Sequence, residues 1–347
     1  MSEVARLGVG LSRVLVLGGS GHIGARLCAL LQAGGWATPV AASSRGGPGR
    51  LRLDTRDEPA LRAALANADA VVNCVAGGAE AIAQGAAALA SAAAAAGCRR
   101  IVHLSTMSVY GAREGVVDES APLDAGLGWY GQAKVQAEGS LTRFAREHGA
   151  SVTLLRPGCV AGPGSQLWVG RVGRWLASRR LGDLGAAGDG WSNLVHVDDV
   201  CQAAMLALRG PAHPDAVRIF NLAAPDSPRW NEYFTDLGIA IGATPVARLG
   251  ALRLKLDAYL AGPSLHVLRK VIGRVGRDVS ALPEAISPGL VGLLGRQLRL
   301  DSSLASRELG LSWTPYSVMV AQGARWWTAQ RVLDSQTRVG GVRVEER

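Results

Sequence analysis

Lysine is nearly absent from this 347-residue sequence, even though its formal net charge is +9. It occurs only as Lys134, Lys255 and Lys270, so almost all of the 37 basic residues are arginines. The arginines are scattered among alanines and glycines, and no RNA- or DNA-binding motif accompanies them. Since a basic charge alone is a weak indication of nucleic-acid binding, we expect no nucleic-acid partner.

Paired cysteines and long apolar runs are also missing. The five cysteines are widely spaced, and no CxxC pair suggests a metal or redox site. The N-terminus has no apolar signal core, and no uninterrupted run of about 20 apolar residues could span a bilayer. These absences predict a cytoplasmic protein with no bound metal and no integral membrane segment.

The first motif is a strand, a glycine-rich turn and a helix between residues 13 and 27. The apolar run Val14–Leu17 predicts a buried strand. Gly18, Gly21 and Gly24 follow it, and then the apolar spacing of a helix resumes. Such a turn lets the backbone approach a pyrophosphate, whose charge the helix N-terminus favours. The GxxGxxG spacing differs from the dinucleotide fingerprint GxGxxG, but its place on the first strand favours a cofactor loop.

An acidic residue is missing after the second predicted strand, at about 39–42. No Asp or Glu occurs between Gly34 and Gly49, where such a residue usually holds the adenosine ribose of NAD. Ser43, Ser44 and Arg45 follow the strand instead, and an arginine there accommodates the 2′-phosphate of NADP. The alternative is an ordinary solvated loop arginine. We favour NADP(H) over NAD(H).

Strands and helices then alternate along the chain. Further strands are expected at 69–75 and 101–104, and helices at 59–67 and 79–96. This alternation predicts an α/β fold with a parallel, doubly wound sheet. In such sheets chemistry is expected beyond the carboxyl ends of the strands.

Three residues form the candidate catalytic group. Tyr130 and Lys134 are four apart and share one face of a predicted helix. A nearby ammonium is expected to lower the pKa of the phenol toward the working range. Thr106, or the neighbouring Ser105, follows the strand at 101–104 and could hydrogen-bond a substrate oxygen. A surface pair of Tyr and Lys is the alternative, but Lys134 stands alone in the first 254 residues of an arginine-rich chain.

These residues resemble the extended, epimerase/dehydratase-like branch of the short-chain dehydrogenase/reductase superfamily. The glycine loop and the Thr-Tyr-Lys group match its cofactor loop and catalytic triad. Four later segments also match, and the resemblance runs from about Arg13 to Trp327. They are Leu155–Gly164 with Ala161 where tyrosine is usual, Asn193–Val200, Ile219–Ala223 and Asp301–Pro315.

The resemblance implies a Rossmann-type domain that binds NAD(P), with a smaller, mostly helical C-terminal part for the substrate. Tyr130 would be the general acid/base, Lys134 would hold the nicotinamide ribose, and Thr106 would hydrogen-bond the reacting oxygen. Asp54 would lie near the adenine, or it could simply cap the next helix. His196, Asp198 and Asp199 match a motif that we interpret as mainly structural. The expected cofactor-binding residues are Gly18, Ser20, Gly21, His22, Ile23, Gly24, Ser43, Ser44, Arg45, Asp54, Thr55, Val75, Ala76, Gly77, Tyr130, Lys134 and Pro157.

The family performs ketone reduction, alcohol oxidation, nucleotide-sugar 4-epimerisation and 4,6-dehydration. Dehydration is disfavoured, because the sugar dehydratases carry Thr-Asp-Glu where this chain has Thr106, Met107 and Ser108. We favour an NADP(H)-dependent oxidoreductase that interconverts a ketone and a secondary alcohol on a fairly hydrophobic small molecule. A nucleotide-sugar 4-epimerase or ketoreductase is the alternative, and a non-catalytic dinucleotide-binding protein is the remote one.

The preference for a hydrophobic substrate comes from the C-terminal region. Leucine, valine, isoleucine, alanine and glycine dominate between Leu249 and Leu300. Such a segment could line an apolar pocket, form the core of the smaller part, or lie on a membrane surface over the basic stretch 248–277.

The domain organisation follows from these motifs. We expect an N-terminal extension at 1–12, the Rossmann domain at 13–165 and a polar tail at 334–347. Residues 166–333 would form a mainly substrate-binding part, from which 193–223 return to the Rossmann domain. A homodimer is possible.

Overall fold

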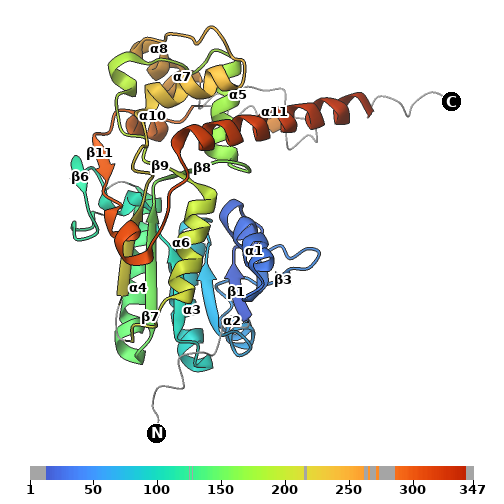
Figure 1. Cartoon of the computed structure of the whole chain (residues 1–347), viewed down its shortest axis with the longest axis vertical. Helices are drawn as coiled ribbons and strands as arrows, with labels where there is room; N and C mark the ends of the chain where they lie inside the picture. The colour runs from blue at the N-terminus through green and yellow to red at the C-terminus, as the bar shows by residue number, and fades with distance from the viewer. Residues whose placement is uncertain are drawn as a thin grey trace, which may run out of the picture. The chain divides into compact units, whose positions relative to one another are not determined.

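The computed structural model describes residues 13–124, 126, 128–214, 217–261, 265, 271–272 and 286–340. The chain divides into two compact units (Figure 1). Unit 1 contains the described residues up to Gly158, together with Val197–Pro225 and Leu300–Trp313. Unit 2 contains Cys159–His196 and the described residues of 226–299 and 314–340.

A seven-stranded parallel sheet forms the centre of unit 1, in the order β10-β7-β5-β4-β1-β2-β3. The inner strand β1 is fully buried after its first residue, which explains its β-branched and leucine-rich sequence. The strand order reverses after β1, and the fold is the expected Rossmann-type α/β fold. The strands are β1 (Arg13–Leu17), β2 (Thr38–Ser43), β3 (Leu51–Arg52), β4 (Ala70–Asn73), β5 (Arg100–Leu104), β7 (Ser151–Pro157) and β10 (Val217–Leu222).

Helices pack on this sheet in two groups. Helices α2 (Glu58–Leu65), α3 (Ala79–Ala96) and α4 (Trp129–His148) lie side by side, and their apolar side chains share one core with the strands. Helix α1 (His22–Gly34) packs against α6 (Val197–Arg209), which Figure 1 shows in front of the strands. Unit 1 also has a 3-10 turn, η1 (Met107–Tyr110), and a short strand, β6 (Gly115–Val117).

Helix α3 is the one described helix that is long and apolar enough to cross a membrane by length and composition. Leu89, Ala92 and Ala93 of this helix are fully buried in the core cluster of unit 1. The apolar residues of α3 therefore have a partner within the fold itself.

Unit 2 is mostly helical. Two short parallel strands, β8 (Cys159–Ala161) and β9 (Leu194–His196), pair with each other. Trp230, Tyr233 and Phe234 of α7 are buried at its core. The other elements are η2 (Gln166–Arg171), α5 (Val172–Ala177), η3 (Gly185–Gly188), α7 (Trp230–Ala240), α8 (Ala251–Leu256), η4 (Asp257–Ala261), α10 (Pro288–Leu294) and α11 (Tyr316–Gly340), with β11 (Leu298–Leu300) and η5 (Ala305–Leu309) at the return to unit 1.

Candidate active site

The glycine loop between β1 and α1 is built for close backbone approach. Gly18 has a φ of +75°, and a Cβ at this position would lie 2.9 Å from the carbonyl oxygen of Cys74. A Cβ on Gly24 would collide with the carbonyl oxygen of Gly18. At the start of α1, Gly21 provides no side-chain cap, and the first turn holds no acidic residue. The loop therefore leaves the helix N-terminus open to an anion, and it fits the pyrophosphate of a dinucleotide.

The end of β2 lies beside this loop, because the amide of Gly19 donates to the carbonyl of Ala42, and a turn follows it directly. Ser43 is buried and its hydroxyl donates to the Gly46 carbonyl at 3.2 Å. Ser44 and Arg45 are exposed on the same turn. Arg45 thus follows, by three residues, the β2 residue that pairs with the glycine loop.

Asp54 and Thr55 follow β3. The Arg56 guanidinium pairs with Asp54 at 2.7 Å and lowers the pKa of that carboxyl to about 2. Thr55 is buried against Gly85 of α3, where no larger residue would fit. The alternative of Asp54 as a helix cap is wrong: Asp57 caps α2, accepting from the amide of Ala60 at 3.1 Å.

Lys134 lies on helix α4, and its side chain reaches the ends of two strands. Its side chain is 1% exposed, and Nζ donates to the carbonyl of Leu104 at 2.6 Å and to that of Val75 at 3.1 Å. Burial lowers the pKa of Lys134 from its ordinary value of 10.5 to about 8. The ammonium is thus held at the carboxyl ends of β4 and β5, beside the segment 75–77 expected to contact the cofactor.

Tyr130 lies one turn earlier on α4 and is hydrogen-bonded to the side chain of Thr106. Thr106 in turn accepts from the amide of Ser108 at 3.2 Å, and its hydroxyl donates to the Ser108 hydroxyl at 3.3 Å. The structure brings the three expected catalytic residues together, at the edge of the sheet where chemistry was expected.

The pKa of Tyr130 differs from the expectation. Burial raises it above the ordinary value, and the hydrogen bond with Thr106 offsets only part of that rise. Burial and Thr106 are the two influences resolved on this pKa, and Lys134 is not among them. The tyrosine is therefore a protonated phenol at neutral pH.

Two buried side chains near Lys134 make no hydrogen bond within the part of the chain that is described. They are His103, through both ring nitrogens, and Ser105, through its hydroxyl. Burial and the Lys134 charge lower the pKa of His103 well below its usual range, so this ring is neutral. Ser105 follows β5 directly, and its unsatisfied hydroxyl is consistent with a polar ligand at this edge.

The chain matches the model of a known protein family. Residues 14–223 match the model of the NAD dependent epimerase/dehydratase family, which covers more than half of the chain. The chain belongs to this family. The resemblance inferred from the sequence motifs is confirmed, and the family is NAD-dependent.

Individual relatives are more distant. Protein YeeZ of Escherichia coli (strain K12) is 29% identical over 244 residues, which cover 65% of this chain and 83% of that protein. Two solved structures of epimerases have the same fold, with TM-scores of 0.70 and 0.69. The first is UDP-glucuronic acid 4-epimerase from Bacillus cereus with UDP-glucuronic acid and NAD, at 18% identity over 92% of this chain and 99% of that chain. The second is UDP-glucose-4-epimerase from Stenotrophomonas maltophila with NAD and formylated UDP-arabinopyranose, at 21% identity over 94% of this chain and 99% of that chain.

A buried ion pair supports helix α4 of this epimerase/dehydratase-family chain, and the sequence analysis missed it. Arg156 of β7 donates to both carboxylate oxygens of Glu138 at 2.9 and 2.6 Å, and the two side chains are 3% and 4% exposed. Arg156 also donates to the Tyr110 hydroxyl, which donates to Asn221 at 2.7 Å. The only local signal was Glu138 four residues after Lys134, on the same helix face.

The expected structural motif at 193–200 contributes polar contacts to each unit separately. In unit 2, His196 Nε2 lies 3.0 Å from the side-chain oxygen of Gln322. In unit 1, Arg26 pairs with both carboxylate oxygens of Asp198, at 2.6 and 2.8 Å. Pro157, the last expected cofactor residue, ends β7 and is buried.

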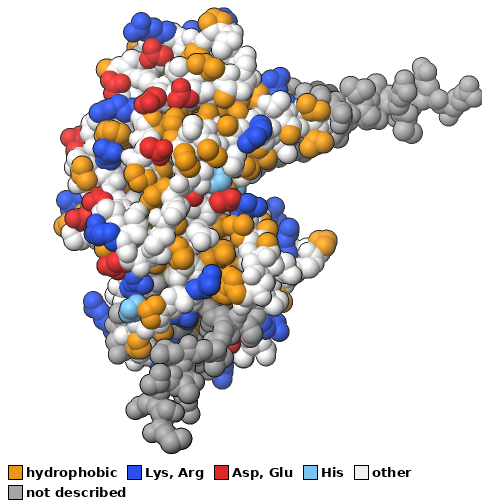
Figure 2. All heavy atoms as spheres, in the orientation of Figure 1, with side chains coloured by type: hydrophobic (Ala, Val, Ile, Leu, Met, Phe, Trp, Pro, Cys, Tyr) orange, Lys and Arg blue, Asp and Glu red, His pale blue; other side chains and the backbone are white. Residues whose placement is uncertain are grey.

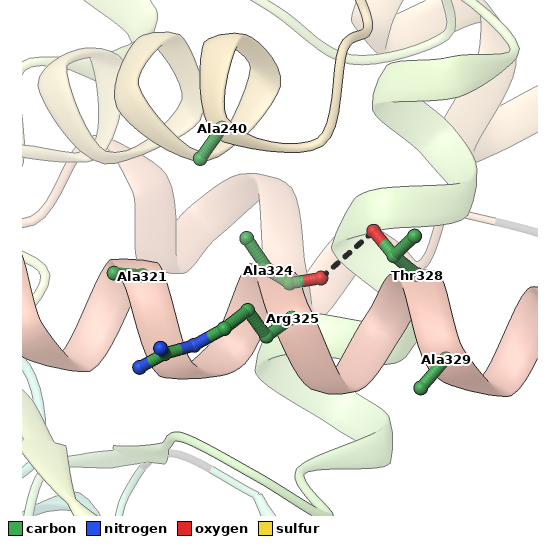
Figure 3. Close-up of a pocket in the computed structure, with 6 residues that line it drawn as sticks. All are labelled: Ala240, Ala321, Ala324, Arg325, Thr328 and Ala329. Atoms are coloured by element: carbon green, nitrogen blue, oxygen red, sulfur yellow. Dashed lines mark hydrogen bonds between the residues drawn. The ribbon is translucent and has the colours of Figure 1, made fainter.

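A cavity of about 570 Å³ lies between α7 and α11 in unit 2 (Figure 3). Figure 3 shows the side chains of α11 along its floor and Ala240 of α7 above them. None of the expected site residues contributes to it. The lining residues are Ala240, Ala321, Ala324, Arg325, Thr328 and Ala329.

The apolar segment expected between Leu249 and Leu300 is only partly core. Leu249, Leu254 and Ala258 are buried, whereas Leu252, Leu256 and Tyr259 are 72%, 47% and 57% exposed. The interpretation as core is therefore wrong for these last three. Val267 and Leu268, which belong to the same expectation, lie outside the described residues, as do residues 1–12 and 341–347.

Proposed function

We propose that this chain is a nicotinamide-dependent enzyme that interconverts a secondary alcohol and a ketone at Tyr130. The observation that carries the proposal is the grouping of Thr106, Tyr130 and Lys134 at the carboxyl ends of β4 and β5. The neighbouring glycine loop fits a pyrophosphate, which supports a dinucleotide as the cofactor.

When bound, the nicotinamide ring supplies the hydride chemistry. In the direction of reduction, the protonated Tyr130 gives its proton to the substrate oxygen, which Thr106 orients. In the direction of oxidation, Tyr130 must first lose its proton. Lys134, four residues later on the same helix, would be the group that assists this loss. Burial holds the pKa of Lys134 at about 8, so it can release and regain a proton near neutral pH, which an arginine cannot do. Lys134 would also hold the nicotinamide ribose.

For the reaction itself, we propose transient oxidation of a nucleotide sugar at C4, that is, a nucleotide-sugar 4-epimerase. Family membership favours this over the ketoreduction that the sequence analysis preferred. The structures of similar fold include 4-epimerases with UDP-sugars and NAD. Unit 2 would then hold most of the nucleotide sugar. Dehydration stays disfavoured, because Met107 and Ser108 stand where a dehydratase needs an acid and a base.

The second candidate is NADP(H)-dependent reduction of a ketone on a hydrophobic molecule. The turn after β2 favours it: Arg45 is exposed on this turn, and no Asp or Glu lies between Gly34 and Gly49. That turn suits the 2′-phosphate of NADP better than the ribose hydroxyls of NAD. Variants of Arg45 test which cofactor binds, whereas variants of the Thr106, Tyr130 and Lys134 group test the reaction.

The experiment begins with titrations of the purified chain with NAD, NADH, NADP and NADPH. A panel of UDP-sugars, apolar ketones and apolar alcohols follows, with nicotinamide absorbance and product analysis as readouts. Interconversion of UDP-sugars with no net change in nicotinamide absorbance supports the epimerase. Net NADPH oxidation with an apolar ketone supports the second candidate. Tight cofactor binding with no turnover on the whole panel would instead indicate a non-catalytic dinucleotide-binding protein.

A further inference from the structure

The helix formed by α8 and η4 in unit 2 has two opposite apolar faces. Leu254 and Ala258 are four residues apart, and both are buried against the rest of the unit. Leu252, Leu256 and Tyr259 follow one another at spacings of four and three, so they share the other face. That face is open to solvent, with exposed fractions of 72%, 47% and 57%. A helix on the surface of a water-exposed domain normally carries polar residues there.

Cations border this exposed apolar face on both sides. At about 100° per residue, Arg253 lies to one side of Leu252 and Lys255 to the other. Both are exposed, and so is Arg248 just before the helix, at 85%. Figure 2 shows hydrophobic, basic and acidic side chains together at the end of unit 2 where Figure 1 labels α8. Lysine is nearly absent from this chain, yet one of its three lysines stands at this border.

Acidic groups balance only one of these cations. Asp257 is the one acidic residue between Ala251 and Ala261, and Arg180 engages it with bonds of 3.0 and 2.5 Å. Asp183 forms an ion pair with Arg248 at 3.5 Å, whereas Arg253 and Lys255 form no ion pair within the described part of the chain. The edge of the apolar face is therefore positive. Long basic side chains can keep their charge in the headgroup layer while their stems cover apolar surface.

We propose that the face made by Leu252, Leu256 and Tyr259, with Arg248, Arg253 and Lys255 around it, docks on an anionic lipid membrane surface. Apolar side chains would enter the boundary between headgroups and acyl chains, and the cations would contact lipid phosphates. A tyrosine suits this depth, since its ring is apolar and its hydroxyl is polar. The binding is peripheral and reversible, because one short helix contributes it.

The test is flotation of the full chain with vesicles of phosphatidylcholine, either pure or with about one third phosphatidylglycerol. We expect binding to the anionic vesicles, at least about tenfold weaker binding to the neutral ones, and release as salt is raised. The triple variant Leu252→Ser/Leu256→Ser/Tyr259→Ser should lose most of the binding. Its matched control is Val116→Ser in unit 1, which removes a side chain that is 71% exposed and should leave binding unchanged.

A second pair of variants separates charge from apolar contact. Arg253→Gln/Lys255→Gln should weaken binding to anionic vesicles, whereas Arg143→Gln/Arg146→Gln on α4 removes the same charge from unit 1 and should have a smaller effect. An unchanged thermal midpoint and unchanged cofactor affinity establish that each variant is folded.

Three results would overturn the proposal. One is no flotation of the native chain with anionic vesicles. Another is full flotation of the folded triple variant. The third is a native dimer that the triple variant converts to a monomer with no vesicle binding by either form, which would assign the face to a second copy of the chain.

Discussion

The Nζ atom of Lys134 lies 2.6 Å from the carbonyl oxygen of Leu104, in a site where this lysine is 1% exposed. One buried ammonium thereby fixes helix α4 against the end of β5, and it brings Tyr130 on the same helix face to Thr106. The proposed catalytic group and the packing of helix α4 depend on the same contact.

The first prediction concerns how far the buried charge of Lys134 lowers the free energy of unfolding. Its pKa is about 8 in the folded chain and 10.5 ordinarily, so between these values the unfolded chain keeps a proton that the folded chain has released. Stability therefore rises with pH in this window, and the penalty is fully present below about pH 8. Relative to Lys134→Met, the native free energy of unfolding should rise by roughly 2–3 kcal/mol from pH 7 to pH 10. Urea unfolding at both pH values measures it. A difference that is independent of pH would mean that the lysine is not buried as a cation.

The second prediction concerns the glycine loop. Gly24→Ala places a Cβ against the Gly18 carbonyl, so the turn must open and dinucleotide affinity should fall at least about tenfold. Gly139→Ala on α4 is the matched control, because a Cβ there meets no atom within 4 Å. That variant should keep its affinity and gain about 0.5–1 kcal/mol of stability. Fluorescence titration with NAD and NADP measures affinity. Equal dinucleotide affinities of the two variants would show that the glycine loop does not bind the cofactor.

The third prediction concerns the buried ion pair between Arg156 and Glu138 of helix α4. Glu138→Gln leaves the Arg156 charge buried without its partner and should lower the free energy of unfolding by about 3–5 kcal/mol. Glu308→Gln breaks the more exposed pair with Arg218 and should cost much less. Denaturant unfolding compares the two variants. Similar losses in both would show that the burial of Arg156 does not matter.

How much of this site could be predicted from sequence depends on how local each contact is. Tyr130 and Lys134 lie together because one helix carries both, four residues apart. Gly18, Gly21 and Gly24 are likewise one local turn, and the edge that carries Thr106 follows from the parallel sheet alone.

Other features depend on neighbours that are distant in the sequence. Arg156 and Glu138 come from a strand and a helix, and no spacing marks them as a pair. The pKa of Tyr130 was expected to fall, but burial by surrounding elements raises it. Leu252 and Leu254 are the same residue type two positions apart, yet Leu252 is exposed and Leu254 is buried.

The fourth prediction concerns the choice of cofactor. Arg45→Ala should weaken NADPH binding by about tenfold or more and leave NADH nearly unchanged, because only NADPH carries the 2′-phosphate. Arg62→Ala, an exposed arginine on α2, should affect neither cofactor. Parallel titrations with both reduced cofactors decide it. An equal effect of Arg45→Ala on the two would show that this turn does not select the cofactor.

The most direct test of the central claim is a single-turnover measurement of nicotinamide absorbance in the native chain and in Tyr130→Phe. Each is loaded with its preferred oxidised cofactor and mixed with the alcohols and UDP-sugars of the panel. We predict that reduced nicotinamide forms in the native chain, and that Tyr130→Phe slows its formation about 10²- to 10⁴-fold with little change in cofactor affinity. Formation at the native rate in Tyr130→Phe would contradict the account, because the proton would then not pass through this tyrosine.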